Sequence, residues 1–261
     1  MTAEAVTAAG SASRDLIAAV AMMKCAAARV NGEGGLARHS VGVSVSSALE
    51  CDADSVALQV AIALGNVRLI GAIDDLTASF RIKGWELTFT PRARTAFDGA
   101  APMAVGQTFS AFAESLTRET RALESAQHVL CAIDISDAGC EHLAAVSGLR
   151  VYVTRARGGA TPQREAFLAY SSCLKHLAVT LSQVCSDLRA LQSGARRAGN
   201  DADLAPKPRR PAAGGISIGP AAEHPQQEVP ESIVAACVFD IQTLFIDAAH
   251  TLRTRCVELV A

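Results

Sequence analysis

Four side chains that could do acid–base or metal chemistry lie close together in the sequence: Asp134, Asp137, Cys140 and His142. They fall at the predicted end of a strand and on the helix that follows, which is where α/β folds place active groups. Acidic residues at the start of a helix are also ordinary capping groups. We prefer the capping explanation. The alternative is a small enzyme or ligand-binding domain, and these four residues are its candidate site. No other catalytic residue is assigned.

The other reactive or ligating side chains form no recognisable motif. The eight cysteines include no C-x-x-C pair and none of the cysteine–histidine spacings of a zinc finger. The glycine-rich stretches at 31–35 and 157–160 lack the strand–loop–helix setting of a phosphate-binding loop. We therefore expect no metal and no cofactor, and we expect reduced cysteines, as in cytoplasmic or nuclear proteins.

Two basic clusters follow each other closely in a proline-rich part of the chain. They are Arg196 with Arg197, and Lys207 with Arg209 and Arg210. The arrangement resembles a bipartite nuclear import signal, and the alternative is a solvated linker whose charges aid solubility. The clusters have no aromatic partners for base stacking and the net charge is −2, so we expect no nucleic-acid partner.

The composition is that of an ordinary globular protein. Half of the 261 residues are hydrophobic and 19% are charged, and the length suits one large domain or two small ones. No run of 18 uncharged apolar residues occurs, so we expect no membrane span.

Residues 41–90 carry a period-two pattern that predicts an antiparallel β-meander. Val56, Leu58 and Val60 alternate with alanine and glutamine, and the alternation continues beyond them. Strict alternation is typical of a strand with one buried face.

Two short turns would join the strands of this meander. The Gly-Asn pair at 65–66 and the Lys-Gly pair at 83–84 stand where two-residue hairpin loops would place apolar side chains on the same face. The alternative, a helix over 54–64 begun by Asp54, is less favoured because of the alternation.

The next part of the chain combines helical periodicity with one α/β unit. The spacing predicts a helix over 105–123, a strand within 128–135, a short helix over 137–146 and a strand within 149–154. The pairing of the two strands, parallel or antiparallel, is left open.

The longest regular pattern begins at Phe167 and predicts a long helix. Large apolar side chains repeat at alternating spacings of three and four, at Phe167, Tyr170, Leu174, Leu177, Leu181, Val184, Leu188 and Leu191. The flanking positions are small and mostly uncharged, so the buried face is wider than the seam of a two-stranded coiled coil. The helix therefore packs on a sheet or in a bundle of three or more helices, within its own chain or with a partner.

A second amphipathic helix is predicted near the end of the chain. It follows residues 195–230, which hold six of the nine prolines and are predicted to be a disordered linker. Its apolar positions are Val234, Val238, Ile241, Phe245, Leu252 and Leu259. With the apolar positions of the long helix they form the candidate interface.

The predicted fold class is α+β: an antiparallel β-meander packed against helices, then a long amphipathic helix, a disordered linker and a C-terminal helix. The predicted divisions are a flexible N-terminus (1–12), a globular domain (13–194), the linker (195–230) and a docking helix (231–261). On this basis we expect a non-catalytic interaction protein, a subunit, adaptor or scaffold, with a protein partner or as a homo-oligomer, in the cytoplasm or the nucleus.

Overall fold

The computed structural model describes residues 3–33, 45–89, 102–154, 162–197 and 231–257. The helices in this part of the chain are α1 (Ala3–Glu33), α2 (Val45–Leu49), α3 (Ala53–Phe89), α4 (Pro102–Leu130), α5 (Asp137–Ser147), α6 (Pro162–Arg197) and α7 (Glu231–Thr251), which continues as a π-helix over Leu252–Val257. The strands are β1 (Ala132–Ile133) and β2 (Tyr152–Val153). The described part is therefore almost entirely helical.

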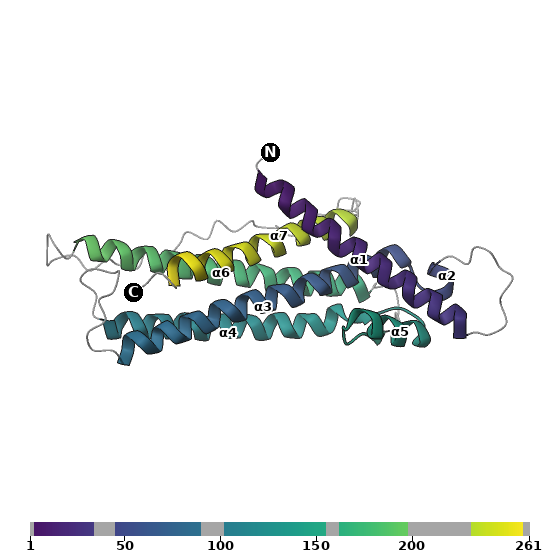
Figure 1. The fold of residues 1–261 in the computed structure, drawn as a ribbon, viewed down its shortest axis with the longest axis horizontal. Helices are drawn as coiled ribbons and strands as arrows, with labels where there is room; N and C mark the ends of the chain where they lie inside the picture. The colour runs from purple at the N-terminus through teal and green to yellow at the C-terminus, as the bar shows by residue number, and fades with distance from the viewer. Residues whose placement is uncertain (1–2, 34–44, 90–101, 155–161, 198–230, 258–261) are drawn as a thin grey trace, which may run out of the picture.

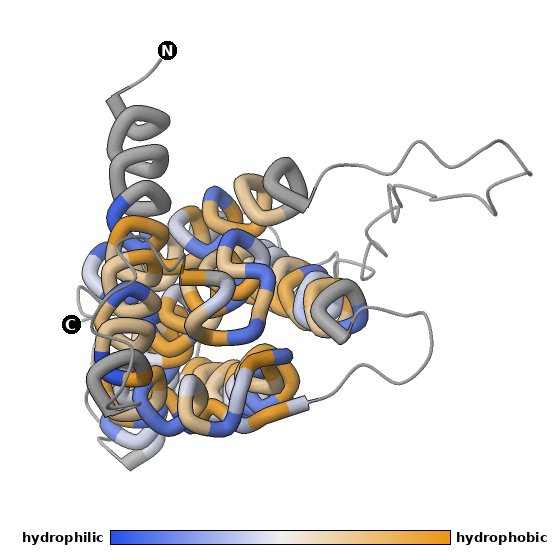
Figure 2. The backbone as a smooth tube through the Cα atoms, turned by 90° about the vertical axis from the view of Figure 1, so that its right-hand side faces the viewer, coloured by the Kyte–Doolittle hydropathy of each residue, from blue (hydrophilic) through white to orange (hydrophobic). Residues whose placement is uncertain are grey.

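Four long helices lie side by side along the long axis of the molecule (Figure 1). Helix α3 makes its most extensive contact with α4, and it also packs against α1 and α7. Helix α6 lies against α4, while α1 crosses the bundle obliquely and reaches α5 at one end. Figure 2 shows the helices from their ends, gathered around a shared core.

Aromatic and aliphatic side chains of α3 and α4 form the centre of the core. Leu69, Ile73 and Phe80 of α3 are fully buried. The ring of Phe80 meets the edge of Phe109 on α4, with the ring centroids 5.4 Å apart. Such edge-to-face pairs add about 0.5–1.5 kcal/mol beyond the burial of their area, so the contact stabilises the α3–α4 pair.

The predicted β-meander over 41–90 is wrong, because most of this range forms the helix α3. The less favoured alternative, a helix begun near Asp54, describes its start correctly. Nearly every residue from Val56 to Ala63 is buried, including the alanines and Gln59 between the larger side chains. A helix that is buried on all sides shows no 3.6-residue periodicity, and the alternation of large and small apolar residues imitated a strand.

The two predicted hairpin turns are also wrong, since both glycines lie inside α3 at close helix–helix approaches. A Cβ atom on Gly65 would overlap the side chain of Gln242 on α7. A Cβ atom on Gly84 would stand 3.0 Å from the carbonyl oxygen of Gly106 on α4. These glycines shorten the distance between neighbouring helices and do not turn the chain.

A small α/β unit follows α4. The predicted short helix is present as α5, capped at its start by Ser136 and ended by Gly148 in the left-handed conformation, with φ of 69°. The flanking strands pair in parallel, which settles the open orientation. Each has only two residues, and α4 takes up the first part of the predicted strand as far as Leu130. An α+β fold class is therefore wrong for the described chain.

The long helix predicted from Phe167 onward is present as α6. Its positions Phe167, Tyr170, Leu174, Leu177, Leu181, Val184 and Leu188 are buried within the chain, and Leu191 packs against the same core. The helix lies in a bundle, as its wide apolar face indicates. That face is covered by α4, α7 and β1 of the same chain.

Helix α7 supplies the other half of the candidate interface. Val238, Phe245 and Leu252 are buried against the bundle, whereas Ile241 is partly exposed. The side chain of Val234 and the whole of Leu259 lie outside the described residues, as do residues 198–230 of the predicted linker.

One helix in the described ranges is long and apolar enough to cross a membrane by length and composition. This is α3, whose most apolar window has a mean hydropathy of 1.8 and is 61% buried within the molecule. Because α1, α4 and α7 cover it, α3 has the surroundings of a core helix.

Candidate functional site

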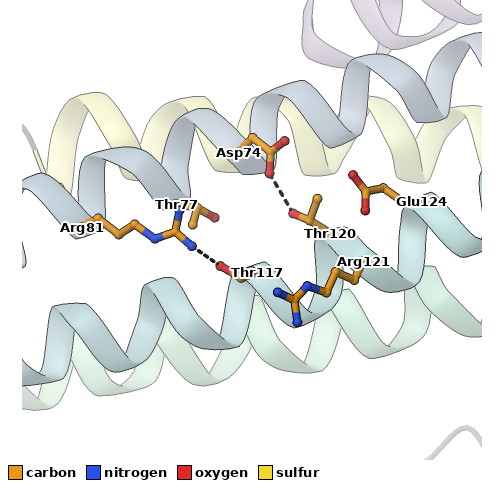
Figure 3. Close-up of a pocket in the computed structure, with 7 residues that line it drawn as sticks. All are labelled: Asp74, Thr77, Arg81, Thr117, Thr120, Arg121 and Glu124. Atoms are coloured by element: carbon orange, nitrogen blue, oxygen red, sulfur yellow. Dashed lines mark hydrogen bonds between the residues drawn. The ribbon is translucent and has the colours of Figure 1, made fainter.

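A polar groove runs between α3 and α4, which are the two helices in closest contact. Figure 3 shows its first section, a cavity of about 310 Å³. Helix α3 contributes Asp74, Thr77 and Arg81, and helix α4 contributes Thr117, Thr120, Arg121 and Glu124. Their spacings of three and four residues place them on one side of each helix, so the two polar stripes face each other.

Two hydrogen bonds across the groove fix the positions of its polar side chains. The guanidinium of Arg81 donates to the hydroxyl of Thr117 over 2.7 Å. The hydroxyl of Thr120 donates to a carboxylate oxygen of Asp74 over 3.1 Å (Figure 3). Both bonds join α3 to α4, so the helices are tied together on their solvent side as well as through the apolar core.

Two charged groups in this section make no hydrogen bond or ion pair with other described residues: Arg121 and Glu124. Figure 3 shows Arg121 extending toward the stretch of the groove near Thr117, where Arg81 also ends. Arg81 itself uses only part of its five donors on Thr117. Two guanidinium groups directed at one stretch of a groove can bind one or two carboxylates through charge-assisted hydrogen bonds.

The groove continues into a second cavity of about 580 Å³, and Arg81 lines both. The second cavity also includes Trp85, Gln107, Ser110 and Glu114. Gly84 also lines it, and α3 and α4 approach closely at this point, since a Cβ atom on Gly106 would stand 2.7 Å from the Gly84 carbonyl oxygen.

The candidate residues at 134–142 lie elsewhere, around α5, and occupy different environments. Asp134 and Asp137 are exposed, Cys140 is buried and His142 is partly buried. Burial and the nearby Asp137 raise the pKa of the Cys140 thiol, so it is held neutral. Within the described residues, no three His, Cys, Asp or Glu side chains are placed to hold a metal ion. The helix cap itself is Ser136, whose oxygen accepts from the Gly139 amide.

The basic clusters lie at and beyond the end of α6. Arg196 and Arg197 belong to its last turn, and their side chains are outside the described part. Lys207, Arg209 and Arg210 lie in the undescribed range 198–230.

The groove was missed because the residues on its α3 side fall in the segment predicted to form strands. Asp74, Thr77 and Arg81 fall on opposite faces of a strand but on one face of a helix. The signal that could have found them is the same polar spacing in α4, at Thr117, Thr120 or Arg121, and Glu124.

Several known proteins resemble this chain. It is 29% identical over 251 residues to the aspartate ammonia-lyase of Corynebacterium glutamicum, covering 79% of this chain and 47% of that protein. It is 33% identical over 199 residues to the aspartate ammonia-lyase of Pseudomonas aeruginosa, covering 70% of this chain and 40% of that protein. This chain thus spans about half the length of these relatives, or less.

A solved structure shares the fold. It is a crystal structure of a fumarate lyase:delta crystallin from Brucella melitensis, with a TM-score of 0.64 and 20% sequence identity, covering 95% of this chain and 76% of that one. The helical bundle is therefore a known arrangement, which confirms that the predicted sheet was wrong.

These resemblances overturn the expected role of a non-catalytic adaptor or scaffold. The relatives are named as enzymes, and the family model that matches residues 37–220 is described as lyase. That match covers most of the chain, from α2 to beyond α6. The chain belongs to the lyase family.

Proposed function

We propose that the chain acts in an ammonia-lyase reaction on an amino dicarboxylic acid of the aspartate type. The observation that carries this proposal is the family match over residues 37–220, together with the relatives named aspartate ammonia-lyase. In this elimination a base takes a proton from the carbon next to the one that bears the amine. The C–N bond breaks, its electron pair leaves with the nitrogen, and a carbon–carbon double bond forms.

The charges of the groove support such a substrate, which carries two carboxylates and one ammonium group. Arg81 and Arg121 offer guanidinium donors to the carboxylates, and Thr117 holds Arg81 in place. The carboxylate of Glu124 is available for the ammonium group, and Asp74 is held by Thr120. The groove thus supplies complementary groups for binding, with its two carboxylates as the candidates for a base.

The activity is tested by incubating the purified chain with L-aspartate. We expect release of ammonia together with the ultraviolet absorbance of the unsaturated dicarboxylate, in equal amounts. D-Aspartate serves as the control substrate. Failure to release ammonia from L-aspartate, by a protein whose circular dichroism shows the helical fold, would contradict the proposal.

The position of the binding groove is tested separately, by Arg121→Gln. We expect KM for the substrate to rise about tenfold or more, because a charge-assisted hydrogen bond contributes about 1.5–3 kcal/mol. Arg118→Gln is the matched control, since Arg118 is an exposed arginine of the same helix whose guanidinium donates to Ser115. If both variants keep the same KM as the original protein, the reaction takes place away from this groove while the family function still holds.

We also propose that the chain assembles with copies of itself, in the cytoplasm. Leu168 and Val179 of α6 are 64% and 65% exposed, and they lie three helical turns apart on one face. Leu244 of α7 is 64% exposed. Exposed apolar side chains that gather into one patch are typical of a surface covered by a partner, and we take these residues to be part of such a patch. A monomeric mass by light scattering would contradict this assembly.

The relatives are bacterial, so nuclear import has no support.

A further inference from the structure

We propose that the second cavity of the groove, around Trp85, binds an aromatic amino acid in its zwitterionic form. The cavity shares Arg81 with the first section of the groove, but binding here goes beyond the proposed lyase activity and is measured without it. The cavity of about 580 Å³ falls within the range of roughly 300–1,000 Å³ that small-molecule sites occupy. It is shaped by α3 on one side and α4 on the other, and both helices are packed in the bundle.

The apolar part of the site is the indole of Trp85. It lines the cavity and is 65% exposed, although it is the only tryptophan in the chain. A large aromatic side chain left in water at the wall of a cavity loses the free energy that its burial would provide. A planar apolar ligand would cover the indole and gain the additional energy of an offset-stacked or edge-to-face aromatic pair.

Two opposite charges stand beside the indole. Arg81 enters the cavity one helical turn before Trp85, and its hydrogen bond to Thr117 leaves most of its donors free. Glu114 lies on α4, one turn before Thr117, and makes no hydrogen bond or ion pair with other described residues. A ligand carboxylate fits Arg81 and a ligand ammonium fits Glu114.

The combination of groups selects one ligand class. A simple carboxylic acid would leave Glu114 unpaired near the new anion, and a simple amine would leave Arg81 unpaired near the new cation. An α-amino acid carries both charges at once, and an aromatic side chain attached to it can reach the indole. The exposed amide of Gln107 and the oxygen of Ser110 offer further hydrogen bonds in the same cavity.

Trp85 is also the reporter for the test, because all tryptophan fluorescence of the chain comes from this cavity. The full chain is titrated with L-phenylalanine, which absorbs at shorter wavelengths than the indole. We expect a saturable change in the intensity or wavelength of the emission. 3-Phenylpropionate lacks the ammonium group and phenethylamine lacks the carboxylate, and each should bind at least about tenfold more weakly.

Two variants with the same change of charge separate the site from a general effect. Glu114→Gln should weaken L-phenylalanine binding about tenfold and leave 3-phenylpropionate binding unchanged. Glu86→Gln is the control, because Glu86 is a neighbour of Trp85 in sequence but pairs with Lys83 over 3.1 Å. Calorimetry on Trp85→Ala, which has no tryptophan fluorescence, should show loss of binding.

Three results would overturn the assignment. The first is an emission that does not change with L-phenylalanine. The second is equal binding of L-phenylalanine and 3-phenylpropionate by the original protein. The third is an equal loss of binding in Glu86→Gln and Glu114→Gln. None of these results affects the lyase proposal, which is measured by ammonia release.

Discussion

Gly65 of α3 lies directly against the side chain of Gln242 of α7, with no room for a Cβ atom between them. The contact places the Gln242 amide where it donates to the Ile62 carbonyl oxygen over 3.0 Å and to the Tyr170 hydroxyl over 2.7 Å. One buried amide therefore joins three helices, α3, α6 and α7, and its position depends on the absence of a single methyl group.

Replacing Gly65 by alanine is expected to destabilise the protein. The new methyl group would displace the Gln242 side chain and disturb both of its buried hydrogen bonds. Overpacking of this kind costs about 1–3 kcal/mol, measured as the free energy of unfolding in urea. Gly71→Ala is the matched control in the same helix, because a Cβ atom there meets nothing within 4 Å. It should raise stability by about 0.5–1 kcal/mol, and equal effects of the two variants would contradict the prediction.

Replacing Gln59 by leucine is expected to loosen the end of α4. The buried Gln59 amide donates to the carbonyl oxygens of Leu130 and Ala132, each over 2.9 Å. Leucine has a similar volume but leaves both carbonyls without this donor, which costs about 1–3 kcal/mol of unfolding free energy. The same change at the exposed Gln107 should shift stability by no more than about 0.5 kcal/mol. If Gln59→Leu left the free energy of unfolding unchanged, the hydrogen bonds from the amide to these carbonyls would not stabilise the fold.

Alkaline pH is expected to destabilise the protein through Cys51. Burial, and then the nearby Asp52 and Asp134, raise the pKa of the Cys51 thiol from 9.0 to about 11. The thiol therefore ionises at a lower pH in the unfolded chain than in the folded one. The free energy of unfolding falls as the pH rises from 9.0 to about 11 for this reason. Unfolding free energies of the original protein and Cys51→Ala should differ by a constant below pH 9.0 and converge or cross above it. Parallel profiles would contradict the assignment.

The start of α5 is expected to depend on the side chain of Ser136. Its oxygen accepts from the Gly139 amide over 3.3 Å, with an extended backbone at the cap. Ser136→Ala should lower the free energy of unfolding by about 1 kcal/mol, because the first turn loses its acceptor. Ser136→Asp keeps an acceptor and should retain most of the stability. If alanine and aspartate behave alike, the cap does not contribute.

The sequence predicted the helices that have one apolar face. In α6 the repeat from Phe167 to Leu188 is buried as a continuous stripe, and the other side is mostly polar apart from the exposed Leu168 and Val179. In α5 the stop at Gly148 was visible because only glycine adopts a φ of 69° at low cost.

Helix α3 could not be predicted in the same way. Residues such as Ala57, Gln59 and Ala61 are buried on faces that a partly exposed helix would leave polar. Their burial depends on parts of the chain far away in the sequence, as when Gln59 bonds to Leu130 and Ala132, so no local pattern records it. The groove was missed for the same reason, since Arg81 and Thr117 become neighbours only once α3 and α4 are known to be antiparallel helices.

The bond between the Gln242 amide and the Ile62 carbonyl spans 180 residues of chain. A ribosome that adds roughly 5–20 residues per second needs roughly ten to forty seconds to deliver the donor after the acceptor has been made. During translation the apolar face of α3 that α7 will cover is therefore exposed to solvent. In that interval a chaperone can bind it.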